Sequence, residues 1–263
     1  MPNEPTLHPD WLRPDWDLPH VHAFMTTRAG GLSRAPHASM NIGLAVGDDA
    51  ATVRLNRARV SEALGAPALF LHQVHGAEVL HLRPAHAQPG AVAPKADAAI
   101  CSTPALGLAI QAADCLPVLF AAPRAVGGAH AGWRGLAGGV LENTVRALCE
   151  ASDCVPGEIQ AWLGACIGPA AFEVGADVLA AFGASPATAD PEVFAYRPNA
   201  AGEPRWRAHL PLLARRRLQA AGLTQIHGGR WCTFSEDSRF FSFRRERFDG
   251  AARGRMVAAI RLR

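Results

Sequence analysis

Apolar residues recur every three or four positions in several segments, as they do along the buried face of an α-helix. The clearest such segment runs from Asp48 to Gly65, and its apolar residues are Ala51, Val53, Leu55, Ala58, Val60 and Leu64. The glycine directly after the last apolar position is a typical helix stop. Similar spacing predicts helices over residues 137–151, 176–182 and 210–221. In the last of these, three consecutive arginines at 215–217 are expected to face solvent.

Short apolar runs bounded by glycine, proline or polar residues predict β-strands. They lie within residues 21–26, 69–76, 79–84, 96–102, 106–122, 125–135, 159–168, 239–246 and 255–263. The long run 106–122 is expected to form two buried strands joined around residues 112–115, because Pro117 disfavours one continuous central strand.

Helices and strands mix along the chain without the regular alternation of βαβ units. This order favours an α+β fold in which helices pack outside sheets. The 263 residues suffice for one substantial core, and no linker-like segment divides them. We therefore expect a single domain over residues 1–263, with the proline-rich residues 1–20 as an N-terminal extension that wraps the surface.

Composition and charge argue against several classes of protein. The net charge of +3 is too small to indicate nucleic-acid binding, and the excess of arginine over the single Lys95 fits a genome-wide base composition. The N-terminus lacks the apolar segment of a signal peptide, and the uncharged stretch 98–113 is too short to span a bilayer. We expect a cytoplasmic protein that binds neither nucleic acid nor membranes. Its six cysteines are then expected to be reduced. The sequence has no CxxC pair, so a zinc-finger site is not expected.

Reactive side chains gather in HQVHG, AADCLPVLF and HAGWRG, where predicted strands end in tight turns. Zinc favours imidazole and thiolate, and a catalytic zinc ion typically has three protein ligands. His75, Cys115 and His130 supply that set, but from three distant segments. Alternatively, Cys115 is a nucleophile with His75 or His130 as its base. A third interpretation is that all three are buried structural residues, and their spacing alone does not separate these alternatives.

The segment HAGWRGLAGG is glycine-rich and leads directly into a predicted helix. Backbone N–H groups at a helix N-terminus attract phosphate or carboxylate, and Arg134 would add a bidentate donor. The segment lacks the ending of a Walker A loop, so a plain tight turn is the alternative. Arg28 in TTRAGG and Arg244 in SFRRE are further candidate anion contacts.

Several long motifs together resemble the YfiH-like family, also called laccase-domain or polyphenol-oxidase-like proteins and described as purine nucleoside phosphorylases. They are LHQVHG, KADAAICSTPALGLAIQAADCLPVLF, GGAHAGWRGLAGGVLENTV, AWLGACIGPAAFEVG, CTFSED, FFSFRRE and GRM. The resemblance runs from about Phe24 to the C-terminus. It implies two packed mixed β-sheets flanked by helices, a four-layer αββα sandwich, and a monomer or small homo-oligomer. It also implies a zinc site at His75, Cys115 and His130. Relatives often have another residue at His72, which is expected to be a structural histidine or one that contacts a metal ligand.

The activity that the resemblance implies is phosphorolysis of adenosine, inosine, guanosine and S-methyl-5'-thioadenosine. The products would be the free base and ribose 1-phosphate or its methylthio counterpart, and adenosine deamination would be a side activity. In this interpretation Arg134 holds phosphate, and Asp114 orients a ligand or moves a proton. Gln73 and Asn41 are candidate substrate contacts.

The sequence departs from the family pattern in two places. Relatives often have GPAIGP where this chain has GACIGP, which places Cys166 near the expected pocket, and TGRM where it has ARGRM. The older family name suggests a copper polyphenol oxidase. However, the chain has one HxH pair, at His20 and His22, and no HCH, so a multicopper site is not expected, although a single site could bind copper. A hydrolase that uses Cys115 on peptidoglycan precursors is the other alternative. A binding module without activity is disfavoured by the three reactive strand ends.

Overall fold

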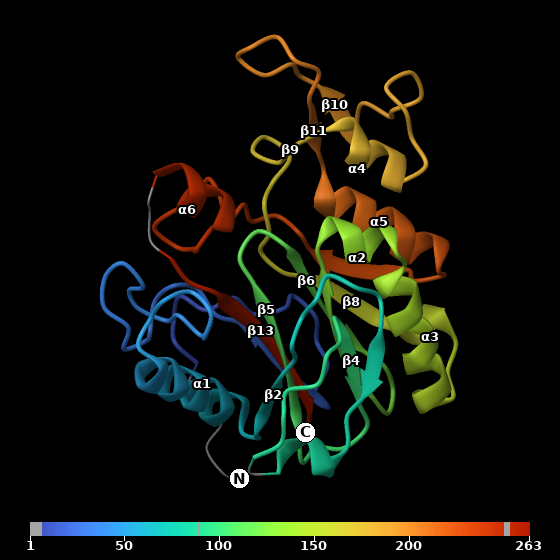
Figure 1. The fold of residues 1–263 in the computed structure, drawn as a ribbon. Helices are drawn as coiled ribbons and strands as arrows, with labels where there is room; N and C mark the ends of the chain where they lie inside the picture. Colours follow the sequence, from blue (N-terminus) through green and yellow to red (C-terminus); the bar gives the residue numbers. More distant parts are fainter. Residues whose placement is uncertain (1–6, 89, 250–252) are drawn as a thin grey trace.

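The computed structural model describes residues 7–88, 90–249 and 253–263 (Figure 1). The strands are β1 (Val21–Met25), β2 (Ala68–Phe70), β3 (Val79–His81), β4 (Ala98–Cys101), β5 (Gly107–Ala112), β6 (Leu116–Ala121), β7 (Val126–Ala131), β8 (Gln160–Leu163), β9 (Glu173–Val174), β10 (Phe194–Tyr196), β11 (Trp206–Ala208), β12 (Gln225–Gly228) and β13 (Met256–Leu262). The helices are α1 (Ala50–Leu64), α2 (Trp133–Ala137), α3 (Val140–Ser152), α4 (Ala176–Ala181), α5 (Leu210–Ala220) and α6 (Phe243–Asp249), with 3-10 turns at Pro84–Ala87 and Pro156–Glu158. Residues 1–6 of the expected N-terminal extension lie outside the described residues.

Two mixed sheets pack face to face in the centre of the molecule. The four-stranded sheet has the order β1-β13-β5-β2, and the six-stranded sheet has the order β12-β8-β6-β7-β4-β3. β2 is parallel to β5, β3 to β4 and β12 to β8, whereas the other neighbours are antiparallel. The apolar layer between the sheets includes the fully buried side chains of Met25, Ile110, Leu119, Trp162 and Met256.

Helices cover the outer face of each sheet (Figure 1). α1 packs against apolar side chains of β1, β5 and β13. On the other side, Leu141 and Leu148 of α3 and Leu218 of α5 share a cluster with side chains of β6, β7 and β8. The expected α+β fold with four layers in the order αββα is therefore confirmed.

A third, small sheet of β10, β11 and β9 projects beyond these layers together with α4 (Figure 1). Phe194 and Trp206 anchor it, because both side chains are buried in the cluster that covers the six-stranded sheet. Nothing in the sequence pattern predicted this sheet. Among the described residues, none of the helices combines the length and apolar character needed to cross a membrane.

Two predicted elements are wrong in detail. The segment 239–246 is not a strand, because Ser242 starts a helix there. Its Oγ accepts a hydrogen bond from the backbone N–H of Arg245 at 3.2 Å, and its carbonyl accepts one from Glu246, as at a helix N-cap. The helix expected over 137–151 begins only at Val140, since Gly139 has a φ of 90° and separates α3 from α2. α2 itself lies where the sequence predicted a glycine-rich turn after a strand.

The predicted exposure of the arginines at 215–217 holds for only one of them. Arg216 is exposed, whereas Arg215 donates a hydrogen bond to the carbonyl of Ile226 at 2.6 Å. Arg217 forms an ion pair of 2.6 Å with Glu142. These two side chains therefore tie α5 to β12 and α3.

The predicted break within residues 106–122 is confirmed. β5 belongs to the four-stranded sheet and β6 to the six-stranded sheet, so the chain crosses between the sheets at residues 113–115. Pro117 lies near the start of β6, opposite His130 of β7. The crossing thus places Cys115 beside both sheets.

Candidate metal centre

The turn after β2, the crossing before β6 and the end of β7 bring His75, Cys115 and His130 together. One imidazole nitrogen of each histidine and the Cys115 Sγ all lie within 4.8 Å of one another. The Sγ lies 3.8 Å from the His75 Nε2, and the two imidazole rings meet edge to face with centroids 4.8 Å apart. The three residues that the sequence singled out therefore form one cluster.

Behind this cluster lies Asp97, a fully buried carboxylate directly before β4. Its Oδ1 accepts hydrogen bonds from the His130 Nδ1 at 2.8 Å and the His75 backbone N–H at 2.9 Å. Its Oδ2 accepts from the backbone N–H groups of Val74 at 3.0 Å and Gly76 at 2.7 Å. Asp97 was not predicted, although the sequence has a signal for it, an acidic residue immediately before an apolar strand in KADAAIC.

The backbone at the cluster adopts conformations that side-chain-bearing residues seldom take. His75 has a φ of 63° and Asp114 a φ of 84°, both in the left-handed region. Gly132 leaves room on the other side, since a Cβ there would lie 3.0 Å from both the Cys115 Sγ and the His75 Cδ2. The cluster is therefore formed by tight turns, and only glycine fits at position 132 without displacing it.

Cys115 and His130 change each other's protonation. Burial disfavours the Cys115 thiolate, yet the neighbouring imidazoles of His130 and His75 outweigh it and lower the thiol pKa to about 6. Burial also disfavours the His130 imidazolium, but Cys115 and Asp97 raise its pKa to about 9. Without a metal ion, the two groups thus form a thiolate–imidazolium pair at neutral pH. The thiolate is also the form in which cysteine binds metals.

The donor set fits a metal ion. Two imidazoles and one thiolate are donors that zinc prefers, and three protein ligands are typical of catalytic zinc. Imidazole and cysteine ligands also suit copper. Among the residues that the structure describes, this is the one group of three or more His, Cys, Asp or Glu side chains spaced to hold a metal ion.

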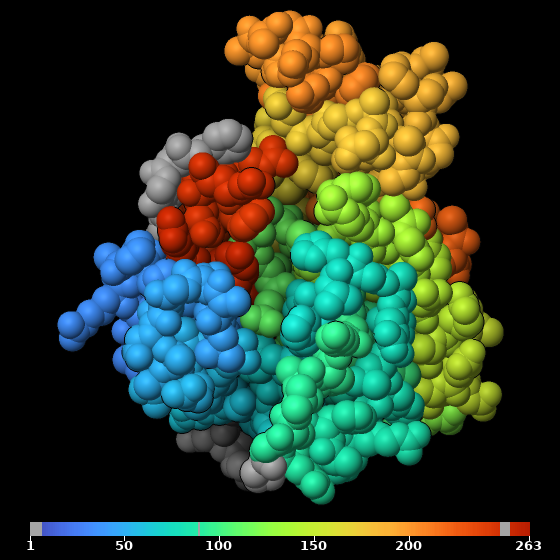
Figure 2. All heavy atoms as spheres, viewed as in Figure 1, coloured from blue at the N-terminus to red at the C-terminus, as the bar shows by residue number. Residues whose placement is uncertain are grey.

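Two cavities border the cluster, and both are lined by His75 and Cys115. The first has a volume of about 590 Å³, and its other lining residues are Ala113, Asp114, Trp133, Arg134, Ile167, Phe172, Leu210, Phe243, Arg244 and Arg247. The second has about 480 Å³, and its polar lining includes Arg57, His72, Gln73, Gln111, His130 and Arg255. Figure 2 shows the surface hollowed between the red segment near α6 and the cyan segment after α1, with green residues below. We call the first, of about 590 Å³, the arginine cavity and the second, of about 480 Å³, the glutamine cavity.

Two of the predicted anion contacts, Arg134 and Arg244, line the arginine cavity. The Arg134 guanidinium lies over the Trp133 ring, 4.3 Å from its centroid. Asp114 lines the same cavity, but its carboxylate is taken up by three donors: the Thr233 hydroxyl at 2.6 Å, the Ser242 hydroxyl at 3.0 Å and the Arg244 backbone N–H at 2.6 Å. It thereby fixes the start of α6.

Gln73 lines the glutamine cavity, and its amide forms two hydrogen bonds with the backbone of Gln111. Arg28 and Asn41, also predicted as contacts, line neither cavity. Arg28 donates to the carbonyls of Ala38 and Asp237, and Asn41 bonds Gly43 and Asp48. His72 is exposed at the rim of the glutamine cavity. Several lining residues were not predicted, namely Phe172, Phe243, Arg247, Arg57, Gln111 and Arg255.

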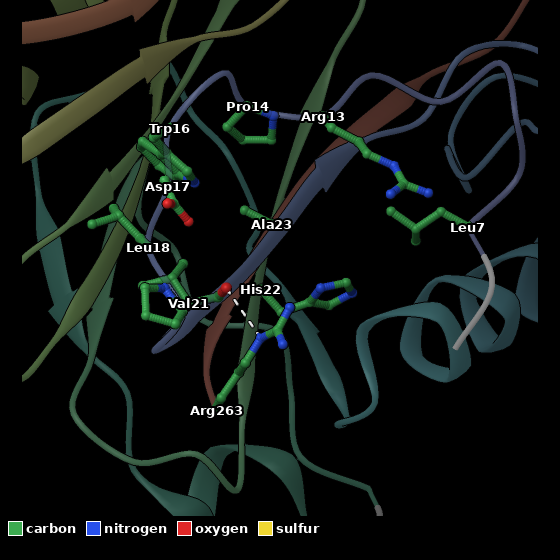
Figure 3. A pocket seen from close by; sticks show the side chains of 11 residues that line it. Leu7, Arg13, Pro14, Trp16, Asp17, Leu18, Val21, His22, Ala23 and Arg263 are labelled. Carbon is green, nitrogen blue, oxygen red and sulfur yellow. Dashed lines mark hydrogen bonds between the residues drawn. The ribbon is translucent and has the colours of Figure 1, made fainter. Parts of the chain in front are cut away.

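A further cavity of about 570 Å³ lies beside β1 (Figure 3). Arg13, Trp16 and Asp17 line it together with His22 and Arg263, and the Arg263 Nε donates a hydrogen bond to the Val21 carbonyl at 3.2 Å. It shares no lining residue with the other two cavities. It is therefore separate from the candidate metal centre.

Fold and site together define an α+β protein with a His–Cys–His cluster between two cavities. A family model described as multi-copper polyphenol oxidoreductase laccase matches residues 22–263. The chain belongs to this family, as the sequence motifs indicated.

Relatives and solved structures agree with this assignment. A Pseudomonas aeruginosa protein named purine nucleoside phosphorylase is 46% identical over 89% of this chain and 93% of its own length. The Escherichia coli protein named purine nucleoside phosphorylase YfiH is 43% identical over 90% of this chain and 94% of its own. The fold is similar to a crystal structure of a Neisseria meningitidis protein that is 40% identical in sequence. The match covers 96% of this chain and 99% of that protein's chain, with a TM-score of 0.82. YlmD from Geobacillus stearothermophilus, 35% identical, covers 93% of each chain with a TM-score of 0.79.

Proposed function

We propose that this protein is a zinc-dependent purine nucleoside phosphorylase, acting in the cytoplasm as a monomer or small homo-oligomer. Its substrates would be adenosine, inosine, guanosine and S-methyl-5'-thioadenosine, with phosphate as the second substrate and adenosine deamination as a side activity. The observation that carries the proposal is the cluster of His75, Cys115 and His130 between two cavities, one of them rich in arginine. The names of the bacterial relatives support it.

Phosphorolysis passes through a transition state with positive charge on the ribose and negative charge on phosphate and base. Arg134, Arg244 and Arg247 would attract and orient phosphate in the arginine cavity. The aromatic rings of Trp133, Phe172 and Phe243 offer apolar surface for a purine. Held there, the two substrates react without the entropic cost of an encounter in solution.

His75, Cys115 and His130 would hold the metal ion, which we propose to be zinc, with copper as the alternative. A bound zinc ion stabilises negative charge on a nearby atom and lowers the pKa of water. Asp97 would keep the Nδ1 of His130 protonated, so that the Nε2 is the available donor. The low pKa of Cys115 keeps its sulfur in the thiolate form at neutral pH.

Product analysis by mass spectrometry tests the proposal. Zinc-loaded and chelator-treated protein would be incubated with adenosine, with and without phosphate. We expect adenine and ribose 1-phosphate only with both zinc and phosphate, and a loss of at least about 100-fold in His75→Ala, because a metal ion contributes several kcal/mol of transition-state stabilisation. His81→Ala, an exposed histidine on β3, is the matched control. Inosine formed without phosphate would instead make the protein mainly a deaminase.

A cysteine hydrolase is the second candidate. Cys115 would be its nucleophile and His130, which interacts with Cys115, its base. Asp97 would orient His130 through the hydrogen bond to Nδ1. Its substrate would be a peptidoglycan precursor, as the family resemblance suggests. Activity on such a precursor that survives chelation and disappears in Cys115→Ser would favour this candidate. Loss on chelation with recovery by zinc would favour the phosphorylase.

A further inference from the structure

Four hydrogen-bond donors converge on Asp97, and all four belong to the candidate metal centre. One is the His130 side chain, and the other three are the consecutive backbone N–H groups of residues 74–76. We propose that Asp97 is the positioning residue of this centre, setting both the nitrogen that His130 presents and the turn that carries His75. The inference rests on the proposed metal site.

The contact with His130 sets the tautomer of its imidazole. The carboxylate accepts the Nδ1–H at 2.8 Å, so in the neutral ring the Nε2 has no proton and keeps its lone pair. A ring without this partner can place its proton on Nε2, where it blocks metal binding. Metal-bound histidines commonly donate their second N–H to a carboxylate for this reason.

The contact with residues 74–76 sets the position of His75. Three successive N–H groups that point to one anion form a concave backbone nest. The left-handed φ of 63° at His75 is part of this turn, and a residue with a side chain adopts it only where its surroundings favour it. Asp97 supplies the anion, and the turn directs the His75 Nε2 towards Cys115.

Asparagine cannot replace Asp97 in this arrangement. An amide has one oxygen acceptor, whereas two donors meet each of the two carboxylate oxygens. If the amide oxygen faces residues 74 and 76, its NH₂ group faces His130 and favours the wrong tautomer. In the opposite orientation the NH₂ group repels the N–H groups of the turn. Either orientation disturbs one histidine ligand.

Binding of Co²⁺ and Zn²⁺ to full-length Asp97→Asn tests the proposal, with absorption bands of Co²⁺ as the signature of the thiolate and imidazole ligands. We expect affinity per folded molecule to fall about 10- to 100-fold and the Co²⁺ spectrum to change. Asp48→Asn is the matched control, because that carboxylate accepts three hydrogen bonds, against four at Asp97, and none comes from the candidate metal centre. Wild-type affinity and spectrum in Asp97→Asn would overturn the proposal, whatever its thermal stability.

If Asp97→Asn does not fold, ¹⁵N NMR of zinc-loaded wild-type protein decides, because the metal-free His130 imidazolium has a proton on both ring nitrogens at neutral pH. The proposal expects the His130 proton on Nδ1, with Nε2 bound to zinc. A proton on Nε2 in the zinc-loaded protein would overturn it. These readouts are independent of the proposed activity. If metal binding depends on Asp97 but the protein does not cleave nucleosides, the phosphorylase is refuted and the positioning role stands. If the protein cleaves nucleosides but Asp97→Asn binds metal as the wild type does, the positioning role is refuted and the phosphorylase stands.

Discussion

Cys115 is the residue at which the two candidate functions differ most, because its thiolate serves either as a ligand or as a nucleophile. Its pKa of about 6 results from imidazole partners that outweigh its burial. The other cysteines with a shifted pKa are shifted the opposite way. Burial raises the pKa of Cys101, Cys149 and Cys166, and that of Cys154 to about 11. Cys115 is therefore distinguishable by its chemistry.

Alkylation of metal-free protein with iodoacetamide should reveal this difference. The thiolate is the reactive form, so the rate at Cys115 should rise with pH, reach half its maximum near pH 6 and be flat above neutrality. An unperturbed thiol reaches half-maximum at about pH 8.5. Mass spectrometry of the peptide with Cys115 measures the rate, and added zinc should protect it. A midpoint near 8.5 would contradict the thiolate–imidazolium pair.

At the scale of elements, α6 shows how a carboxylate far away in sequence determines where cavity residues lie. Asp114 accepts hydrogen bonds from Thr233, Ser242 and the backbone of Arg244, which joins the crossing between β5 and β6 to the start of α6. α6 contributes Phe243, Arg244 and Arg247 to the arginine cavity. The placement of these side chains therefore depends on Asp114.

Asp114→Asn should weaken phosphate use more than it affects metal binding. Asparagine offers one oxygen acceptor for three donors, so the start of α6 loosens and Arg244 loses its position. A hydrogen bond to a charged group is worth about 1.5–3 kcal/mol, which predicts a rise in the KM for phosphate of about tenfold or more. Steady-state kinetics with varied phosphate provides the measurement. Asp237→Asn, an exposed carboxylate in the preceding segment, is the control and should leave the KM unchanged.

The same element marks the limit of what the sequence predicts. Periodicity located α1, α3 and α5 because each buries one apolar face. The apolar run around Phe240 and Phe241 suggested a strand, although Ser242, the next residue, caps a helix that begins at Phe243. β9, β10 and β11 have only two or three residues each, too few for an alternating pattern. Local pattern therefore predicts long elements and misses those set by single caps or distant pairing.

The site was predictable to a similar extent. The residue types of His75, Cys115 and His130 indicated metal chemistry, whereas the family resemblance, not their spacing, indicated that they converge. Asp97 was missed because its role depends on β4 lying beside the turn at residues 74–76, which no local pattern reveals. Arg28 and Asn41, also predicted as contacts, line neither cavity, and their side chains bond neighbouring loops.

At the scale of the whole molecule, the candidate ligands come from both sheets. His75 follows β2 of the four-stranded sheet, His130 lies on β7 of the six-stranded sheet, and Cys115 lies where the chain crosses between them. A metal ion bound by all three would join the sheets at this point. Because the unfolded chain does not hold the three donors together, metal binding should stabilise the whole fold.

Metal removal should therefore lower the thermal stability of the entire protein. At a free metal concentration of 100 times the Kd, binding contributes about 2.7 kcal/mol, which corresponds to a Tm difference of roughly 5–10 °C for a chain of this size. Calorimetry of zinc-loaded and chelated wild-type protein measures it. In Cys115→Ser the zinc-dependent shift should largely disappear, because serine is a poor zinc ligand. An equal shift in that variant would show that zinc stabilises the fold from another site.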